Sequence, residues 1–160
     1  MEARFTHYRS TRKITVLLTG SFARTLDEKN RIGLPKRLRE QLGSPNSLFV
    51  SPGADKSLWL YTSGALERLA EALDRAPATD AEARKFRRLY FAQTESVDVD
   101  RAGRILIPER LSGFGELKRE VMLLGVRDHL EIWDAERWRQ YLAENAAGFD
   151  AVAEGAFRSH

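Results

Sequence analysis

The feature that most constrains this sequence is an internal repeat. The nine residues DEKNRIGLP at 27–35 return as DRAGRILIP at 100–108, an offset of 73 (100 − 27). Further along, LWLY at 58–61 corresponds to LEIW at 130–133, an offset of 72 after a one-residue slip in a loop. Each copy is shorter than the ~60 residues at which an independent core is already marginal. We therefore predict two copies of one module, residues 20–75 and 94–145, that complete a single core together.

Composition narrows the class of protein. Of 160 residues, 42% are hydrophobic and 31% charged, which excludes general disorder and a collagen-like fold. No apolar run approaches the ~20 residues of a membrane helix, so we expect no membrane partner. The chain has no cysteine, which excludes disulfides, cysteine-ligated zinc and a thiol nucleophile. Residues 1–80 contain 13 Lys and Arg against 9 Asp and Glu, or +4, which favours an anionic partner for the front half.

Local patterns predict the same order of elements in both copies. Strands are expected at residues 20–26, 31–34, 47–51, 58–61, 94–99, 104–107, 120–125 and 130–133. Short helices are expected at 35–42 and 108–111, with proline at the first helical position, and longer ones at 65–75, 81–91 and 135–145. Asn30 and Gly103 share one slot in the repeated turn, and both residue types tolerate positive φ, so this slot is predicted to be left-handed. Ser63, Asp80 and Asp134 are the predicted helix N-caps.

The remaining segments flank or join the two copies. Residues 1–19 form a basic extension whose apolar stretch, residues 14–18, is shorter than the ~7–15 residues of a secretory signal. We interpret it as a flexible basic arm leading into a first strand, with a cleaved signal as the alternative. Residues 76–93 are a linker with a connector helix, and residues 146–160, rich in alanine, glycine and polar residues, are expected to be a frayed tail.

With the doubled D-x-x-x-R-I-x-(L/I)-P motif established, the sequence resembles the MraZ family. The matching stretches are 26–31 with 34–35, 98–108 and 125–133, and the resemblance spans roughly residues 18–142. Two details differ from the family pattern: Asn30 stands where glycine is usual, and the first 17 residues have no counterpart.

The resemblance implies an α+β fold of two tandem SpoVT/AbrB-type modules. These would be swapped-hairpin β-barrels that form an intrachain pseudo-dimer, each with short flanking helices. It also implies a ring-like homo-oligomer and a transcriptional regulator in the cytoplasm, associated with the nucleoid. Such a protein binds direct repeats in double-stranded DNA upstream of the division and cell-wall gene cluster, its own operon included.

Basic residues in the repeated turns are the candidate DNA contacts. Lys and Arg neutralise phosphates, and Arg also recognises guanine through a bidentate contact. Arg31 and Arg104 are the first candidates because each occupies the arginine slot that the resemblance carries over. The second-rank candidates are Lys29 and Arg101, and Arg24 and Lys36 are weaker flanking candidates.

A structural role for the same motif is the alternative. Asp27 and Asp100 precede the motif arginines by four residues and could pair with them across the turn. A surface ion pair contributes only ~0–1 kcal/mol, which is a weak reason to keep an arginine. We therefore assign DNA binding to the arginines, and to the two aspartates the orientation of the arginines or the capping of the turn.

Other patterns have less specific interpretations. The basic stretch 84–88 could be a second DNA surface, or the solvated face of an amphipathic connector helix, and we favour the latter. Trp59, Trp133 and Trp138 fall at repeated positions and are predicted to pack in the core.

No enzyme is predicted. The three histidines are isolated, and there is no nucleophile elbow, phosphate-binding glycine loop or metal-ligand spacing. We accordingly expect no catalytic residues, cofactor, metal or small-molecule substrate. The rival function is an AbrB-fold protein-interaction module of the antitoxin type, which usually has one module and a long disordered tail.

Overall fold

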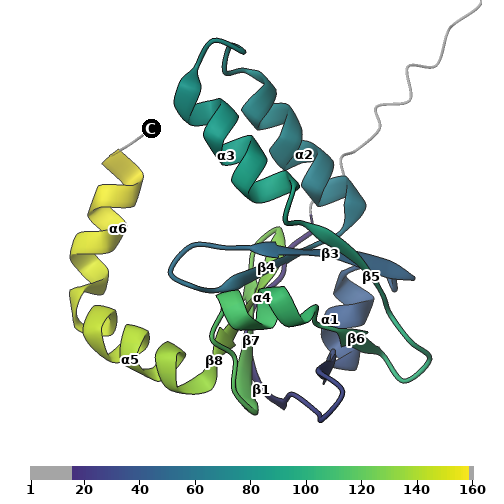
Figure 1. Ribbon diagram of the computed structural model, residues 1–160. Helices are drawn as coiled ribbons and strands as arrows, with labels where there is room; N and C mark the ends of the chain where they lie inside the picture. Colours follow the sequence, from purple (N-terminus) through teal and green to yellow (C-terminus); the bar gives the residue numbers. More distant parts are fainter. Residues whose placement is uncertain (1–15, 159–160) are drawn as a thin grey trace, which may run out of the picture.

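The structure, a computed structural model, describes residues 16–158 and has an α+β fold (Figure 1). Its strands are β1 (Ser21–Thr25), β2 (Arg31–Gly33), β3 (Ser47–Pro52), β4 (Leu58–Tyr61), β5 (Glu95–Asp98), β6 (Arg104–Leu106), β7 (Glu120–Val126) and β8 (His129–Asp134). Its helices are α1 (Lys36–Gln41), α2 (Ser63–Asp74), α3 (Ala81–Phe91), α4 (Glu109–Phe114), α5 (Ala135–Asn145), the 3-10 turn η1 (Ala146–Gly148) and α6 (Phe149–Arg158). None of the helices within 16–158 is long and apolar enough to span a bilayer.

The helix starts confirm two predicted caps and correct the others. Asp80 and Asp134 each accept the backbone N–H three residues ahead, which caps α3 and α5 as expected. The cap of α2 is Thr62 rather than Ser63, because the Thr62 hydroxyl accepts the N–H of Ala65 at 3.2 Å. Pro35 and Pro108 are N-caps with extended ψ near 139° and 137°, not first helical residues as predicted. Helix α4 also continues past the predicted end at residue 111, to Phe114.

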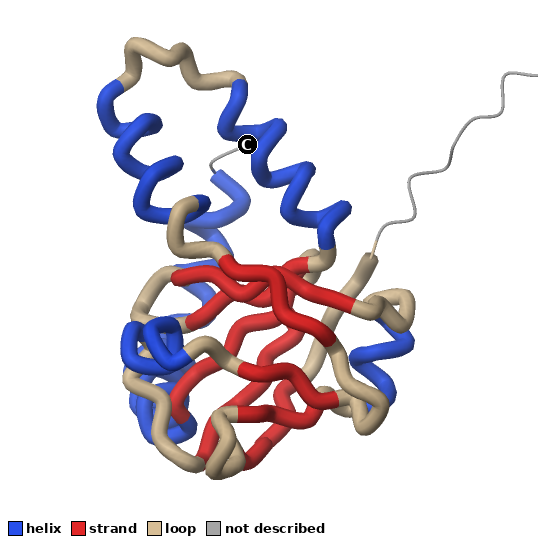
Figure 2. Tube along the Cα trace, turned by 45° about the vertical axis from the view of Figure 1, so that its right-hand side comes forward, coloured by secondary structure: helices blue, strands red, loops and turns tan. Residues whose placement is uncertain are grey.

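The two copies exchange strands. The main sheet is antiparallel with the order β1-β7-β8-β4-β3-β5, so β1 of the first copy pairs with β7 of the second. In return, β5 of the second copy pairs with β3 of the first, and β4 pairs with β8 at the centre. Strands β2 and β6 form a separate two-stranded antiparallel ribbon (Figure 2). The predicted strands are thus confirmed as elements, and their pairing joins the copies closely.

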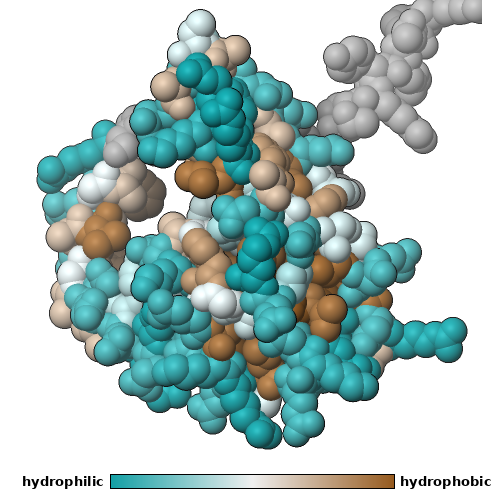
Figure 3. Space-filling model, viewed as in Figure 1, coloured by the Kyte–Doolittle hydropathy of each residue, from teal (hydrophilic) through white to brown (hydrophobic). Residues whose placement is uncertain are grey.

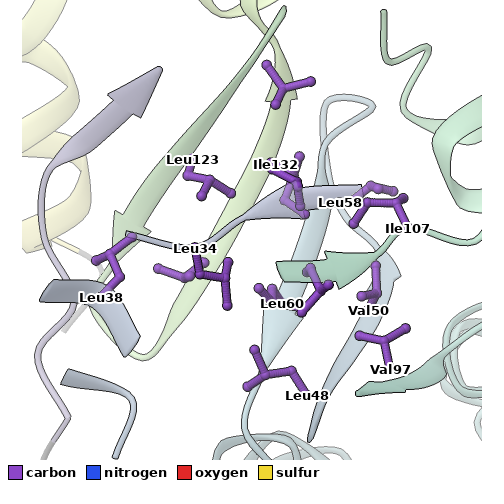
Figure 4. Packing of buried hydrophobic residues seen from close by; sticks show 14 of the residues in the cluster. Leu34, Leu38, Leu48, Val50, Leu58, Leu60, Val97, Ile107, Leu123 and Ile132 are labelled. Carbon is purple, nitrogen blue, oxygen red and sulfur yellow. The ribbon is translucent and has the colours of Figure 1, made fainter. Parts of the chain in front are cut away.

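One hydrophobic core serves both copies, as the repeat predicted. Side chains from each copy point into the same space between the main sheet and the ribbon (Figure 4). Leu60 of β4 lies opposite Leu130 of β8, and both are fully buried. Because burying a leucine side chain contributes ~1.5–3 kcal/mol, neither copy keeps this stabilisation alone. The fully buried members include Leu18, Ile32, Leu38, Leu48, Val50, Leu58, Leu60, Leu111, Leu123, Leu130 and Ile132.

The tryptophans lie in two aromatic groups beside this aliphatic core. Trp59 packs with Tyr61 and Tyr90, at ring distances of 6.4 and 6.0 Å. Trp133 is buried and packs against Trp138 on α5, at 5.4 Å. The prediction that the tryptophans pack is therefore confirmed, although Trp59 and Trp138 are only half-buried.

The prediction of a frayed C-terminal tail is wrong for residues 146–158. These residues form η1 and α6, and α6 leans away from the sheet (Figure 1). Phe149, Val152 and Phe157 recur at helical spacing, and Asp150 and Arg158 lie at the helix ends that the helix dipole favours for their charges. The alanine content that suggested fraying is itself favourable for a helix.

The start of the described chain belongs to the core. Leu18, predicted to lie in the basic extension, is fully buried and exchanges two backbone hydrogen bonds with Arg127, at 2.7 and 2.9 Å. The rest of the predicted basic arm, residues 1–15, lies outside the described residues.

Candidate nucleic-acid interface

The β2–β6 ribbon brings the two motif arginines to one face. Ile32 lies opposite Ile105, and both are buried, so they form the inner face of the ribbon. Side chains alternate along a strand, which puts Arg31 and Arg104 together on the outer face. Arg31 pairs with Leu106, whose side chain is 52% exposed. Two arginines separated by 73 positions in the sequence therefore become diagonal neighbours on one exposed ribbon.

The aspartate of the first motif both caps the turn and holds the arginine. Oδ1 of Asp27 accepts the backbone N–H of Lys29 at 2.9 Å and that of Arg31 at 2.8 Å. Oδ2 of Asp27 accepts Nε of Arg31 at 2.8 Å. This contact uses only Nε, and among the described residues the two terminal nitrogens of Arg31 have no hydrogen bond. The two terminal nitrogens of an arginine side chain are the pair of donors that can bind a phosphate or a guanine in bidentate fashion.

The second motif repeats this geometry. Oδ1 of Asp100 accepts the N–H groups of Ala102 and Arg104, each at 2.9 Å. Oδ2 of Asp100 accepts Nε of Arg104, also at 2.9 Å. The two roles proposed for the aspartates, orientation and capping, therefore occur together in both copies. This spacing explains why the sequence repeats D-x-x-x-R.

Hydrogen bonding keeps these aspartates ionised. The backbone N–H of Arg31 donates to the Asp27 carboxylate and, with the guanidinium, holds the pKa of that group below its ordinary value. The backbone N–H of Arg104 does the same to the pKa of Asp100. The stabilisation of the fold by these two carboxylates is thus present at pH values above the ordinary aspartate pKa. It is lost only as the pH falls through the lowered pKa.

The left-handed turn position is confirmed in both copies, with φ of 61° at Asn30 and 77° at Gly103. The two residues are nevertheless supported differently. The Asn30 amide donates to the carbonyl of Ile107 at 2.8 Å. Gly103 has no side chain, and the guanidinium of Arg39 lies over it, donating from Nε to the carbonyl of Leu34 at 3.2 Å.

Sequence reasoning missed Arg39. The only signal was indirect: Asn30 and Gly103 differ in a slot that is otherwise repeated, so another side chain had to replace the amide. Nothing in the local pattern showed which residue that would be.

The other candidates are placed less uniformly. Lys29 and Arg101 lie in the exposed turns, and Lys36 is the exposed first residue of α1, with Nζ 3.9 Å from the Glu40 carboxylate. Arg24 lies on β1, opposite Val121 in the main sheet, so the structure does not bring it onto the ribbon.

The basic connector helix uses two of its arginines internally. Arg84 donates to the carbonyl of Ala78, and Arg87 donates to those of Leu73 and Ala76, which closes the loop between α2 and α3. Tyr90 anchors the same helix on the sheet through a buried hydrogen bond with Ser51 at 2.9 Å. These contacts agree with an amphipathic connector.

A second polar cluster, also missed from sequence, surrounds His129. Its Nδ1 lies 2.7 Å from Asp128 and its Nε2 lies 3.2 Å from Glu131, while its ring stacks on Tyr61 at 4.9 Å. Burial opposes the charged form, but the hydrogen bonds to Glu131 and Asp128 outweigh it and raise the pKa of His129. The cluster ties the turn between β7 and β8 to β4. Within the described chain, no three His, Asp or Glu side chains are grouped so as to hold a metal ion.

Comparison with known proteins gives matches over most of the chain. A family model described as "MraZ protein, putative antitoxin-like" matches twice, at residues 17–89 and 90–159. A protein named Transcriptional regulator MraZ from Leuconostoc mesenteroides is 37% identical over 139 residues, 87% of this chain and 96% of the relative. Proteins of the same name from Lactiplantibacillus plantarum and Finegoldia magna are 36% and 30% identical, over 84% and 87% of this chain and 94% and 96% of those relatives.

Proposed function

The chain belongs to the MraZ family, and we propose that it is a sequence-specific DNA-binding regulator of transcription. The observation that carries this proposal is the outer face of the β2–β6 ribbon, where Arg31 and Arg104 lie together. Their terminal guanidinium nitrogens have no hydrogen-bond partner among residues 16–158. The major groove of DNA, ~12 Å wide, admits a two-stranded ribbon, and arginine is its commonest base-specific contact. The exposed turns would add Lys29 and Arg101 as phosphate contacts.

The target that we propose is a set of direct repeats in the promoter of the protein's own operon, within the bacterial division and cell-wall gene cluster. Repression there follows if the bound protein covers the promoter, and nucleoid association follows from the DNA partner. The fold that we propose for the two modules is an intrachain pseudo-dimer of swapped-hairpin barrels. The exchanged pairings of β1 with β7 and β5 with β3 support it.

We also propose that the chain assembles into a ring of identical subunits. Helix α6 exposes Phe149, Val152 and Phe157, the last 82% exposed, and Figure 3 shows hydrophobic surface over this helix. Helix α3 exposes Phe86 and Leu89. Contiguous apolar surface on exposed helices is typical of an interface.

The charges on these two helices are complementary. Helix α3 carries four basic residues and one acidic residue, whereas α6 carries two acidic residues and one basic one. Because the two surfaces differ, their contact is heterologous, and heterologous contacts that close give a ring.

A gel shift with the DNA upstream of the protein's own reading frame tests this function, at low and at moderate salt. The double variant Arg31→Ala/Arg104→Ala is expected to lose binding at both salt concentrations while its thermal midpoint stays close to that of the parent, because exposed ion pairs contribute little. Arg31→Lys tests whether the fork geometry matters beyond charge. Arg88→Ala on the exposed face of α3 is the matched control and should bind normally.

Two results would contradict the proposal. One is a double variant that binds like the parent, which would leave the Asp–Arg pairs with a structural role only. The other is a parent chain that binds no DNA even at low salt, which would favour the antitoxin-like protein-interaction module.

A further inference from the structure

The two turns of the pseudo-repeat share one backbone but not one surface. Head 1 denotes residues 27–31 with residues 109–116, and head 2 the equivalent residues 100–104 with residues 36–43. In head 1 the backbone N–H of Ile107 donates to the backbone carbonyl of Asn30 at 2.8 Å. In head 2 the backbone N–H of Leu34 donates to the backbone carbonyl of Gly103 at 2.9 Å. The two heads therefore share the same backbone hydrogen bonds across the ribbon.

The side chains that support each turn have been exchanged. In head 1, Asn30 supplies the amide that donates to a carbonyl, and the position facing it on α4 holds a short residue, Ser112. In head 2 the turn holds Gly103, and the equivalent helix position holds Arg39, which donates to the matching carbonyl. A Cβ on residue 103 would lie 2.6 Å from Cζ of Arg39, so the glycine makes room for the guanidinium. A neutral amide in one head is thereby replaced by a cation in the other.

The formal charges diverge in the same direction. Head 1 contains four acidic and three basic side chains, giving −1, and head 2 contains two acidic and five basic ones, giving +3. Leaving out the side chains that form ion pairs within residues 16–158 does not change these net charges. Glu28, Lys29 and Glu109 then remain in head 1.

In head 2 the corresponding set is Arg37, Arg39 and Arg101. The sharpest difference is at one equivalent position, which holds Glu28 in head 1 and Arg101 in head 2. The groove between the start of the turn and the segment after the short helix is about 400 Å³ in head 1 and about 250 Å³ in head 2, where Arg39 lines it.

We propose that the two heads bind DNA unequally: beyond Arg31 and Arg104, which both contact DNA, head 2 holds the phosphates beside the ribbon with Arg39 as an additional contact, and the other side chains of head 1 add little. This inference rests on the proposed function, since it assigns the partner contacts within the same site. Neutralising phosphates releases counterions, so three unpaired cations strengthen binding. Glu28 and Glu109 in head 1 repel the same phosphates.

An unequal pair of heads gives each chain a direction on DNA. A DNA-binding protein with true two-fold symmetry recognises a palindromic sequence, because the two half-sites of a palindrome are related by the same two-fold axis. A chain in which one head dominates binding recognises a DNA sequence that is not palindromic. Identical subunits placed side by side in a ring would then follow units repeated in one direction, which is the arrangement of the proposed target.

Matched single substitutions test this inference by fluorescence anisotropy, with the duplex from upstream of the reading frame. Arg101→Ala and Lys29→Ala each remove one exposed cation from a turn. Arg101→Ala is expected to weaken binding by about tenfold and to lower the slope of log K against log salt by about 1. Lys29→Ala removes the weaker of the two phosphate contacts, because Glu28 and Glu109 lie in the same head, and is expected to weaken binding by less than threefold. Arg39→Gln keeps a donor for the Leu34 carbonyl and should resemble Arg101→Ala, and Glu28→Arg should strengthen binding.

A second measurement exploits the absence of cysteine from the chain. Lys29→Cys and Ala102→Cys place one thiol at equivalent positions of the two heads, where a photo-crosslinker can be attached. Crosslinking to the duplex is expected mainly from position 102.

The outcomes separate the inference from the proposed function. Equal losses from Arg101→Ala and Lys29→Ala, or equal crosslinking from positions 29 and 102, would overturn the unequal heads while leaving DNA binding intact. A parent chain that does not bind the duplex would overturn both. Thermal midpoints equal to the parent's establish that any loss comes from binding.

Discussion

Replacing Gly103 by alanine probes the support of the second turn directly. The added Cβ would lie 2.6 Å from Cζ and Nε of Arg39, and the residue would have to keep a φ of 77°. Left-handed backbone costs a non-glycine residue about 1–2 kcal/mol. Moving Arg39 aside also breaks its hydrogen bond to Leu34, worth about 1 kcal/mol net. We therefore expect Gly103→Ala to lower the free energy of unfolding by about 2–3 kcal/mol.

Gly43→Ala is the matched control. Gly43 has a φ of 84°, but no atom of the described residues lies within 4 Å of a Cβ built there. Only the cost of the left-handed backbone, about 1–2 kcal/mol, therefore applies. Urea unfolding at a fixed protein concentration, followed by tryptophan fluorescence, gives both values. In an Arg39→Ala background, the cost of Gly103→Ala should fall to that of Gly43→Ala. Equal costs in the parent background, or an unchanged excess without Arg39, would refute the assigned contact.

Two further predictions concern His129 and α6. The raised pKa of His129 means that its stabilisation is complete below pH 6.5, its ordinary pKa, and is lost as the pH rises through the raised value. The free energy of unfolding in urea should therefore fall more between pH 6 and pH 9 for the parent than for His129→Gln. If the two plots of this free energy against pH are parallel, the proposed role of the His129 cluster is wrong. Phe157→Asp should lower the mass measured by light scattering at micromolar concentration, without changing the circular dichroism at 222 nm by more than a few per cent. An unchanged mass would exclude α6 from the subunit contact.

The local elements were predictable from sequence because their causes are local. Alternating residues and a following proline delimit the short strands, and Asp80 and Asp134 cap their helices through contacts only three residues long. The left-handed slot was equally visible, because Asn30 and Gly103 belong to the small set of residues that tolerate it. The D-x-x-x-R motif spans five residues, so the pairing of Asp27 with Arg31 could be proposed before the structure.

The contacts that create the candidate site could not be predicted, because they join residues far apart in the chain. The register that puts Arg31 and Arg104 on one face depends on the pairing of β2 with β6, which no local pattern specifies. The placement of Arg39 over Gly103 spans 64 positions (103 − 39). The surroundings of His129 likewise depend on the pairing of β4 with β8. Helix α6 was missed for another reason, because composition outweighed the helical spacing of its apolar residues.

Fusion of the two modules into one chain is what allows the turns to differ. In a homodimer of single modules, every position occurs twice, so one residue would have to suit both turns. The exchange seen here needs an amide on the turn in one half and a glycine in the other, with Ser112 and Arg39 at the equivalent helix positions. A symmetric dimer cannot hold both arrangements. The shared core and the D-x-x-x-R caps hold both turns in one backbone conformation, whereas the exposed positions, which neither constrains, carry opposite net charge.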